Sequence, residues 1–308
     1  MKSKLKQKTE VDIIITAFNN EDMISRCLEN VKNQSFKKIK CFVIDDNSTD
    51  RTCEKIKKFR WVKLIKRGTN SGPSLNRNIG INTGNSKYIA TLDSDTVLDK
   101  NWLMEQINCL EKNKDKKIGI LASKLLFMKN PRIINSAGGH IKFPGIGYDL
   151  NAGEKNSKKF DNLKEVDYAC SAAMLMRREM IEKIGAFDKT YFYGHEDTDL
   201  GWRARIAGYK VIYNPKALAY HYVNQTVKTM SKKVIFHGTK NRIRSIIKNC
   251  TLVSMPFYIT AYFLISLGQT ILMKHRLERI NAWWWNLINI SDTLKERKKV
   301  QNVKNIIS

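Results

Sequence analysis

Acidic residues are scarce in this sequence. The 308 residues include 29 Asp and Glu and 55 Lys and Arg, which gives a formal net charge of +26. This balance excludes an acidic protein, and a hydrophobic content of 42% argues against a disordered one. Such an excess predicts an anionic partner, and three kinds are compatible with it: nucleic acid, a phosphate-bearing small molecule, or an anionic lipid surface.

Cysteine is the second scarce residue type. The six cysteines are scattered, no C-x-x-C pair occurs, and no His lies near them at zinc-ligand spacing. This pattern argues against a disulfide framework and favours reduced thiols in a cytoplasmic setting. The first apolar run is preceded by lysines, without the apolar stretch of about 7 to 15 residues that a secretory signal needs. We therefore expect the catalytic part of the chain not to be exported.

Short apolar runs alternate with helical patterns in the first part of the chain. The expected strands cover residues 11–17, 39–44 and 61–65, and the expected helices between them cover 23–31 and 52–59. This alternation predicts an α/β protein with a mostly parallel sheet and right-handed crossovers. In such sheets ligands bind at the carboxyl ends of the strands.

The later part of the chain is less regular. We expect helices over 74–82 and 197–208 and strands over 87–92 and 210–213. Residues 136–161 are rich in Gly, Asn and Lys and are predicted to form an irregular excursion over the active face. His221 is expected just beyond a loop that contains Pro215.

Two acidic clusters carry candidate chemistry. Asp93 and Asp95 follow the strand 87–92, and alternation along an extended chain directs both carboxylates to the same side. Such a pair suits Mg²⁺ or Mn²⁺ shared with a diphosphate, although a solvated turn would give the same pattern. In the second cluster, Glu196 and Asp197 are close enough to raise one another's pKa, as a catalytic base requires, whereas an acidic helix start is the alternative interpretation.

Taken alone, His221 and Arg77 point to no function, because a single His or Arg is more often a satisfied or solvated residue. The order of the motifs changes this. Five of them follow one another: residues 11–19, 43–50, 77–80, 92–95 and 196–197. In this order the chain resembles the inverting glycosyltransferases of family 2 from about Val11 to Tyr222, and its later part is most similar to the rhamnosyltransferase-like branch.

The resemblance implies a GT-A fold and transfer of a sugar from a nucleotide-diphosphate donor to a hydroxyl of a glycan or lipid-linked acceptor. It implies Asp197 as the catalytic base, with Glu196 beside it. The implied donor-binding residues are Thr16, Phe18, Asn19, Asp46, Arg77, Asp93 and Ser94. The implied ligands of a Mg²⁺ or Mn²⁺ ion are Asp93, Asp95 and His221. Within the donor site, Asp46 would hydrogen-bond the base and Arg77 would hold the base or the diphosphate.

The composition changes after about residue 224. Residues 225–308 contain 15 Lys and Arg against 3 Asp and Glu, a net charge of 15 − 3 = +12, yet residues 250–273 carry no charge at all. We therefore expect a catalytic domain over 1–235 and a basic, apolar helical tail over 236–308. Basic flanks on both sides of 250–273 favour a re-entrant or interfacial helix at the cytoplasmic face of a membrane over a simple span. A buried helical subdomain is the alternative.

Two other functions remain as alternatives to glycosyl transfer. A metal-dependent nucleotidyltransferase would also need paired carboxylates, but it would not need Glu196 and Asp197 a hundred residues downstream. A nucleic-acid-binding protein is suggested by charge alone. No helix-turn-helix, zinc-finger or RNP pattern supports it, so we expect no nucleic-acid partner.

Overall fold

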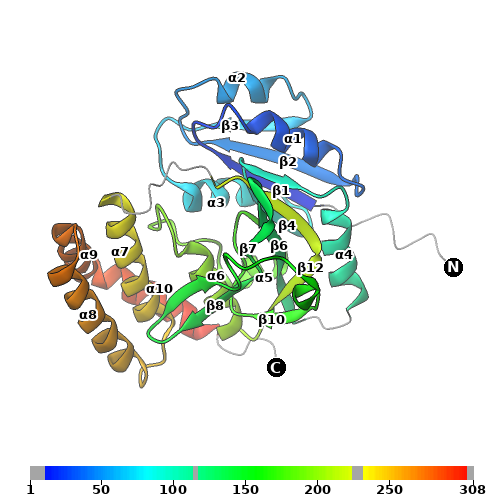
Figure 1. The fold of residues 1–308 in the computed structure, drawn as a ribbon. Coiled ribbons are helices and arrows are strands. Elements are labelled where there is room, and N and C mark those ends of the chain that lie inside the picture. Colours follow the sequence, from blue (N-terminus) through cyan, green and yellow to red (C-terminus); the bar gives the residue numbers. More distant parts are fainter. Residues whose placement is uncertain (1–10, 114–116, 224–231, 304–308) are drawn as a thin grey trace.

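A ten-stranded sheet forms the centre of the protein in the computed structural model, which describes residues 11–113, 117–223 and 232–303 (Figure 1). The strand order is β10-β12-β6-β11-β4-β1-β2-β3, with β5 paired to β12 and β7 paired to β6. The strands of this sheet are β1 (Val11–Ala17), β2 (Ile39–Asp45), β3 (Val62–Lys66), β4 (Tyr88–Asp93), β5 (Thr96–Leu98), β6 (Ile118–Phe127), β7 (Asn130–Ser136), β10 (Lys164–Val166), β11 (Ala173–Arg177) and β12 (Lys210–His221).

The first four strands pair as the sequence predicts. β1 is parallel to β2 and to β4, and β2 is parallel to β3. Every residue of β1 is buried, which explains its unbroken apolar run. Beyond β4 the sheet becomes mixed, because β11 pairs antiparallel with both β4 and β6. The predicted α/β fold is confirmed, with a parallel half at β1 to β4 and a mixed half beyond it.

Helices cover both faces of the sheet. One apolar core joins the sheet to α1 (Ile24–Lys32), α2 (Thr52–Lys57) and α4 (Trp102–Lys112). A second core, on the opposite face, joins it to α3 (Pro73–Thr83), α5 (Arg178–Ile184) and α6 (Glu196–Ile206). Successive residues of β1 enter different cores: Ile13 and Ile15 belong to the first and Ile14 to the second, as strand alternation requires.

Two predictions for the later part of the chain were wrong. Within the segment 136–161, β8 (Gly139–Lys142) and β9 (Ile146–Asp149) form an antiparallel hairpin instead of an irregular excursion. A short 3-10 helix, η2 (Lys158–Phe160), follows. The predicted strand 210–213 also does not stop before Pro215. β12 continues to His221, with a register shift between Asn214 and Leu218 that accommodates the proline.

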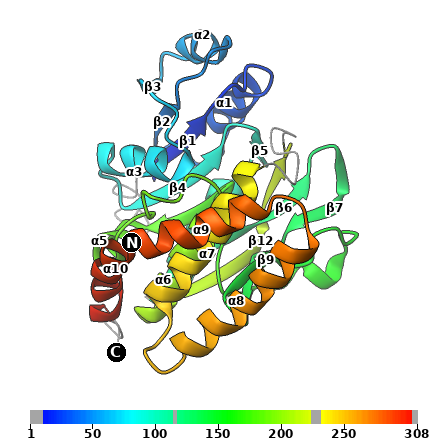
Figure 2. The same cartoon turned by 90° about the vertical axis from the view of Figure 1, so that its left-hand side faces the viewer.

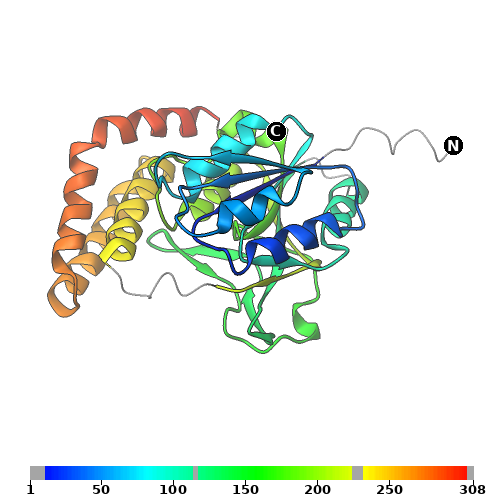
Figure 3. The same ribbon diagram turned by 90° about the horizontal axis from the view of Figure 1, so that it is seen from above.

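In the described part of the chain, four helices follow β12 and lie together on one side of the central sheet and its covering helices (Figures 2 and 3). They are α7 (Lys232–Asn249), α8 (Met255–Leu272), α9 (Arg276–Ile288) and α10 (Ile290–Asn302). Within the described part of the chain, α8 is the one helix long and apolar enough to cross a membrane, and only 11% of it is buried. Its buried residues are Tyr262 and Ser266. The alternative of a buried helix is therefore wrong for α8.

The basic flank that precedes α8 is not a solvated polybasic segment. Lys240, Arg244 and Lys248 of α7 are buried. Arg244 and Lys248 both make ion pairs with Asp188 of the catalytic part. These charges are neutralised inside the protein, so they do not add to the attraction of the tail for an anionic surface.

Candidate active site

The carboxyl ends of β1, β2 and β4 bring three polar loops to one edge of the sheet. Thr16 is aligned with Asp93 across β1 and β4, and Ala17 is aligned with Asp45 across β1 and β2. Because parallel strands end at the same edge, residues that are dozens of positions apart in the sequence become neighbours. The candidate residues of the two acidic clusters lie at this edge or face it.

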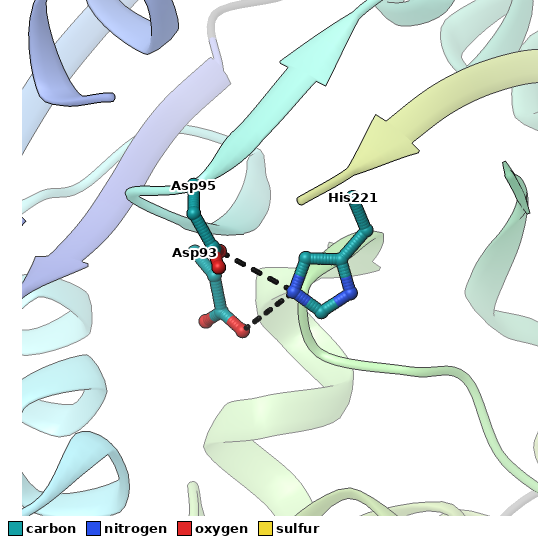
Figure 4. Close-up of side chains that lie close together, drawn as sticks. All are labelled: Asp93, Asp95 and His221. Carbon is teal, nitrogen blue, oxygen red and sulfur yellow. Dashed lines mark ion pairs between the residues drawn. The ribbon is translucent and has the colours of Figure 1, made fainter. Parts of the chain in front are cut away.

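Asp93, Asp95 and His221 form a group of possible metal ligands (Figure 4). His221 Nε2 lies 3.3 Å from Asp95 Oδ1 and 3.9 Å from Asp93 Oδ2. All three ligand atoms lie within 4.8 Å of one another. The extension of β12 past Pro215 makes this possible, since it pairs His221 with Thr96 of β5, next to Asp95.

A second contact orients the imidazole ring. His221 Nδ1 lies 3.0 Å from the carboxamide oxygen of Asn135 in β7. An amide oxygen only accepts hydrogen bonds, so it favours the proton on Nδ1 and leaves the Nε2 lone pair facing the two carboxylates. Two carboxylate oxygens and one imidazole nitrogen fit a divalent cation, and metal-binding His residues are commonly oriented in this way.

Arg77 joins the two acidic clusters. It projects from α3, its Nη2 donates to Asp93 Oδ1 at 2.7 Å, and its Nη1 donates to Glu196 Oε1 at 2.9 Å. The side chain is only 2% exposed. Burial alone would lower the pKa of Arg77, but the two carboxylates outweigh this effect and raise it. Both ends of the guanidinium are engaged by protein carboxylates, so Arg77 fixes the distance between the clusters.

Glu196 and Asp197 begin α6. The residue before them, His195, has a left-handed backbone with φ of 72°, and Gly194 has the same φ. Glu196 is buried and its Oε1 is held by Arg77, whereas Asp197 is partly exposed and its Oδ1 accepts the amide hydrogen of Thr198 at 2.7 Å. Burial, followed by the charges of Glu196 and Asp149, raises the pKa of Asp197 to about 8. A carboxyl with that pKa, open to the site, is suited to accept a proton near neutral pH.

Asp149 is a candidate residue that the sequence did not reveal. It ends β9, and its Oδ1 accepts a hydrogen bond from Ser136 at 2.9 Å. Its charge contributes to the pKa shifts of Asp197 and of His221, which places it beside both clusters. Tyr168, a buried neighbour whose pKa is raised by burial and then by Asp149 and Asp197, lies beside it. In the sequence, Asp149 is a single Asp within the segment 136–161, which was predicted to be irregular, so nothing in the sequence indicated that it lies near the site.

Among the predicted donor-binding residues, Phe18, Asn19 and Asp46 lie in the loops after β1 and β2, and Ser94 lies between Asp93 and Asp95. Thr16, Arg77 and Asp93 belong to β1, α3 and β4. Asp46 is buried, and its two oxygens accept the amide hydrogens of Ser71 and Gly72 at 2.7 and 2.8 Å. It therefore shapes the entry to α3. Asn19 likewise braces the neighbouring loop, because its Oδ1 accepts the amide hydrogen of Thr49 at 2.8 Å.

Three further donor-site candidates differ in exposure. Thr16 is buried at 9% exposure, whereas the ring of Phe18 is 42% exposed and faces solvent at the end of β1. Ser94 is buried, and its hydroxyl accepts a hydrogen bond from Asn20 Nδ2 at 2.7 Å. Asn20 thus joins the loop after β1 to the segment that carries Asp93 and Asp95. The structure gathers all the predicted site residues into this one region.

Comparison with known proteins agrees with this geometry. The family model described as "Glycosyl transferase family 2" matches residues 12–185, which is more than half of the chain. The chain is 24% identical over 267 residues to the pre-mycofactocin glycosyltransferase of Mycobacterium tuberculosis, covering 84% of this chain and 53% of that protein. It is 24% identical over 237 residues to a poly-beta-1,6-N-acetyl-D-glucosamine synthase of Staphylococcus epidermidis, covering 76% and 55%. The chain thus spans about half the length of these relatives.

Solved structures share the fold. The mannosyltransferase PcManGT of Pyrobaculum calidifontis, in complex with GDP-Man and Mn²⁺, matches with a TM-score of 0.57 and 14% identity, covering 97% of this chain and 86% of that chain. GalNAc-T7 with UDP, GalNAc and Mn²⁺ matches with a TM-score of 0.68 and 15% identity, covering 94% and 58%. At this level of identity the likeness extends to the fold, and the chemistry has to be argued from the residues of this chain.

Proposed function

Because the chain belongs to glycosyl transferase family 2, we propose that it transfers a hexosyl or deoxyhexosyl group from a nucleotide-diphosphate sugar to an acceptor hydroxyl with inversion of the anomeric carbon. One observation carries the proposal. A buried arginine joins a group of possible metal ligands, Asp93 with Asp95 and His221, to an acidic pair whose partly exposed member, Asp197, is poised to take a proton. Sugar transfer from a diphosphate needs both functions side by side.

Asp93, Asp95 and His221 would hold Mn²⁺ or Mg²⁺. Two carboxylates suit either ion, and the imidazole nitrogen favours Mn²⁺, because Mg²⁺ prefers oxygen ligands. The Mn²⁺ in both matching structures supports this assignment. When bound, the cation would supply positive charge beside the diphosphate of the donor.

Asp197 would act as the catalytic base. As the acceptor oxygen attacks C1 of the sugar, its hydrogen passes to the carboxylate of Asp197, and the bond between C1 and the diphosphate oxygen breaks with its electron pair leaving on the diphosphate. Attack and departure occur on opposite faces, so one displacement inverts the anomeric centre. Burial and then the charge of Glu196 would raise the pKa of Asp197, while Arg77 would hold Glu196 at a fixed distance from Asp93.

The donor would lie over the loops after β1 and β2. Phe18 offers an exposed ring against which a base can stack, with Thr16 beside it and Asp46 and Asn19 bracing the loops. Arg77 would act through Asp93 and Glu196 rather than by touching the donor, since both of its ends already donate to those carboxylates.

A glycan or lipid-linked acceptor at the cytoplasmic face of a membrane fits the tail best. Along α8 and α9, large apolar side chains are exposed, among them Leu264 at 61%, Leu272 at 84% and Trp284 at 62%. An apolar helix surface of this size favours a lipid interface. Two exposed basic residues, Lys274 after α8 and Arg276 at the start of α9, suit anionic headgroups. We propose an interfacial position for α8.

A panel of nucleotide sugars tests the reaction. The true donor with Mn²⁺ should raise the free energy of unfolding by about 2.7 kcal/mol at 100 times its Kd, because it binds only the folded state. Turnover of that donor should release a free nucleoside diphosphate. Release of pyrophosphate would support a nucleotidyltransferase instead, and salt-sensitive nucleic-acid binding without donor binding would support the third alternative.

A further inference from the structure

Helix α7 contacts the segment that carries the acidic pair through a polar face. Its residues Lys240, Asn241, Arg244, Ser245 and Lys248 are all buried and recur at helical spacing. In a sequence this pattern is typical of a solvated face. In the structure this polar face of α7 packs against residues 188–199, the segment that includes Glu196 and Asp197 and ends at Asp199.

Three hydrogen bonds from α7 hold the backbone just before Glu196 and Asp197. Asn241 Nδ2 donates to the carbonyl oxygens of Tyr193 and Gly194, at 3.0 and 2.7 Å. Lys240 Nζ donates to the carbonyl oxygen of Thr190 at 2.5 Å. His195 has a positive φ of 72°, a backbone conformation that is unfavourable for a residue other than glycine, so these contacts stabilise a strained turn directly ahead of Glu196.

Buried ion pairs hold both ends of the segment. At its start, Asp188 Oδ2 accepts hydrogen bonds from Arg244 Nε at 2.8 Å and from Lys248 Nζ at 2.7 Å. At its end, Asp199 is fully buried and lies 3.0 Å from Lys248 Nζ. Burial alone would raise the pKa of Asp199, but Lys248 and Arg203 outweigh it and lower that pKa to about 2. Lys248 therefore joins the first and last acidic residues of the segment.

The other side of α7 is fixed by the last helix. Arg244 Nη1 donates to Thr293 Oγ1 at 2.7 Å, and Arg297 Nη1 donates to the carbonyl oxygens of Ile247 and Cys250 at 2.5 and 2.6 Å. Packing energy alone does not explain such a polar interface, because apolar residues of similar volume are often at least as stabilising as buried ion pairs. In this protein the hydrogen-bonded charges give α7 directional contacts with Asp188, Thr293 and residues 190–199, which define its position relative to that segment.

We infer that α7 is a positioning element of the active site, with Asn241 and Lys248 acting as positioning residues that set the place of Asp197 through the backbone of residues 190–199. The inference rests on the proposed function for its catalytic readout. It makes the first helix of the tail part of the catalytic machinery, although no residue of α7 is placed in contact with donor or metal.

Two variants test this inference. Asn241→Leu removes the two hydrogen bonds to the turn and changes no charge, and Lys248→Met removes the shared cation. Each should lower kcat about 10- to 100-fold while the KM for the donor stays within about twofold, because a misplaced base slows the chemical step without changing donor contacts. Lys248→Arg, which keeps the cation, should recover most of the rate. Lys232→Ala, an exposed change on the same helix, serves as the control and should match wild type.

Amide hydrogen exchange gives a readout that does not depend on turnover. In Asn241→Leu the amides of residues 190–199 should exchange faster, while those of β1 should keep wild-type protection. Unchanged protection of 190–199, or a raised KM with unchanged kcat, would overturn the inference. Wild-type protein that turns over no nucleotide sugar would refute the proposed function, while the exchange result would still decide the role of α7. If Lys248→Met does not fold, Asn241→Leu carries the test, since it leaves every ion pair in place.

Discussion

The raised pKa of Asp197 predicts a specific dependence of rate on pH. With a pKa of about 8, roughly one tenth of the molecules carry the ionised base at pH 7 and roughly one hundredth at pH 6. The base must be ionised to accept a proton. Log kcat/KM should therefore rise with a slope of about one from pH 5 to 7 and level off above about pH 8.

Replacing the base should remove both the rate and this pH dependence. Asp197→Asn keeps the shape of the side chain and can still accept the Thr198 amide hydrogen. We expect kcat to fall about 10²- to 10⁴-fold, with donor affinity unchanged by calorimetry. Glu165→Gln, which alters an exposed carboxylate of the same domain, is the matched control.

The raised pKa of Asp197 also affects stability: the rate should rise with pH, whereas the free energy of unfolding should fall with pH. A carboxyl whose folded-state pKa is raised destabilises the fold increasingly as pH rises from the unfolded pKa toward about 8, because folding then opposes its ionisation. Asp197→Asn should thus raise the Tm at pH 8 and leave it nearly unchanged at pH 4. A wild-type acid limb near pH 4, or an active Asp197→Asn enzyme, would refute the assignment.

Three more predictions concern the elements around the base. Asn135→Leu should weaken Mn²⁺ binding about 10- to 100-fold in a direct titration, because the His221 ring loses its orienting partner; unchanged affinity would remove His221 from the ligand set. Arg77→Met should lower the free energy of unfolding, measured in urea, by about 3–5 kcal/mol, because Asp93 and Glu196 would lose their ion-pair partner. A loss below about 1 kcal/mol would contradict the proposed role of Arg77 in joining these two carboxylates. The double variant Leu264→Asp, Leu272→Asp should no longer pellet with anionic liposomes. Wild type and the control variant Leu163→Asp, which changes an exposed leucine outside the helical tail, should still pellet. If the double variant pellets as well as these two proteins, the α8 surface is not the lipid contact.

The parallel half of the sheet was predictable because β1, β2 and β4 are largely buried on both faces, whereas the edge strand β3 is only partly buried. A fully buried strand such as β1 needs apolar residues at every position, and an unbroken apolar run is the clearest strand signal that a sequence carries. The polar residues that end such strands could be placed at one edge by topology alone. That is why the loops after β1, β2 and β4 could be expected at one edge, while the common side of Asp93 and Asp95 followed from alternation along the chain.

The hairpin β8–β9 was missed for the opposite reason. Its strands are only four residues long, they are largely unburied, and each contains a glycine, Gly139 in β8 and Gly147 in β9, so neither propensity nor alternation marks them. Asp149 was missed with the hairpin. The end of β12 was missed because Pro215 ordinarily stops a strand, whereas here a register shift accommodates it and carries His221 to the metal-ligand group.

The polar face of α7 could not be read from the sequence. Lys240, Arg244 and Lys248 have the spacing of a solvated face. The carboxylate partners of Arg244 and Lys248 are Asp188 and Asp199, and Lys240 binds the carbonyl oxygen of Thr190; all of these partners lie about 50 to 60 positions earlier. Charges distant in the sequence give no local signal of being paired. Only the packed structure distinguishes a buried ionic interface from a basic flank.

That interface also constrains how this chain can change over generations. The helices beyond α7 meet the catalytic part through few contacts of their own, so their apolar surface can be exchanged residue by residue as the acceptor or the membrane changes. Lys248 cannot be replaced independently by an uncharged residue, because Asp188 and Asp199 would both lose a buried counter-charge. Substitutions here should appear as correlated sets, so that α7 is inherited with the acidic segment and with its partners on α10, while the exposed faces of α8 and α9 diversify.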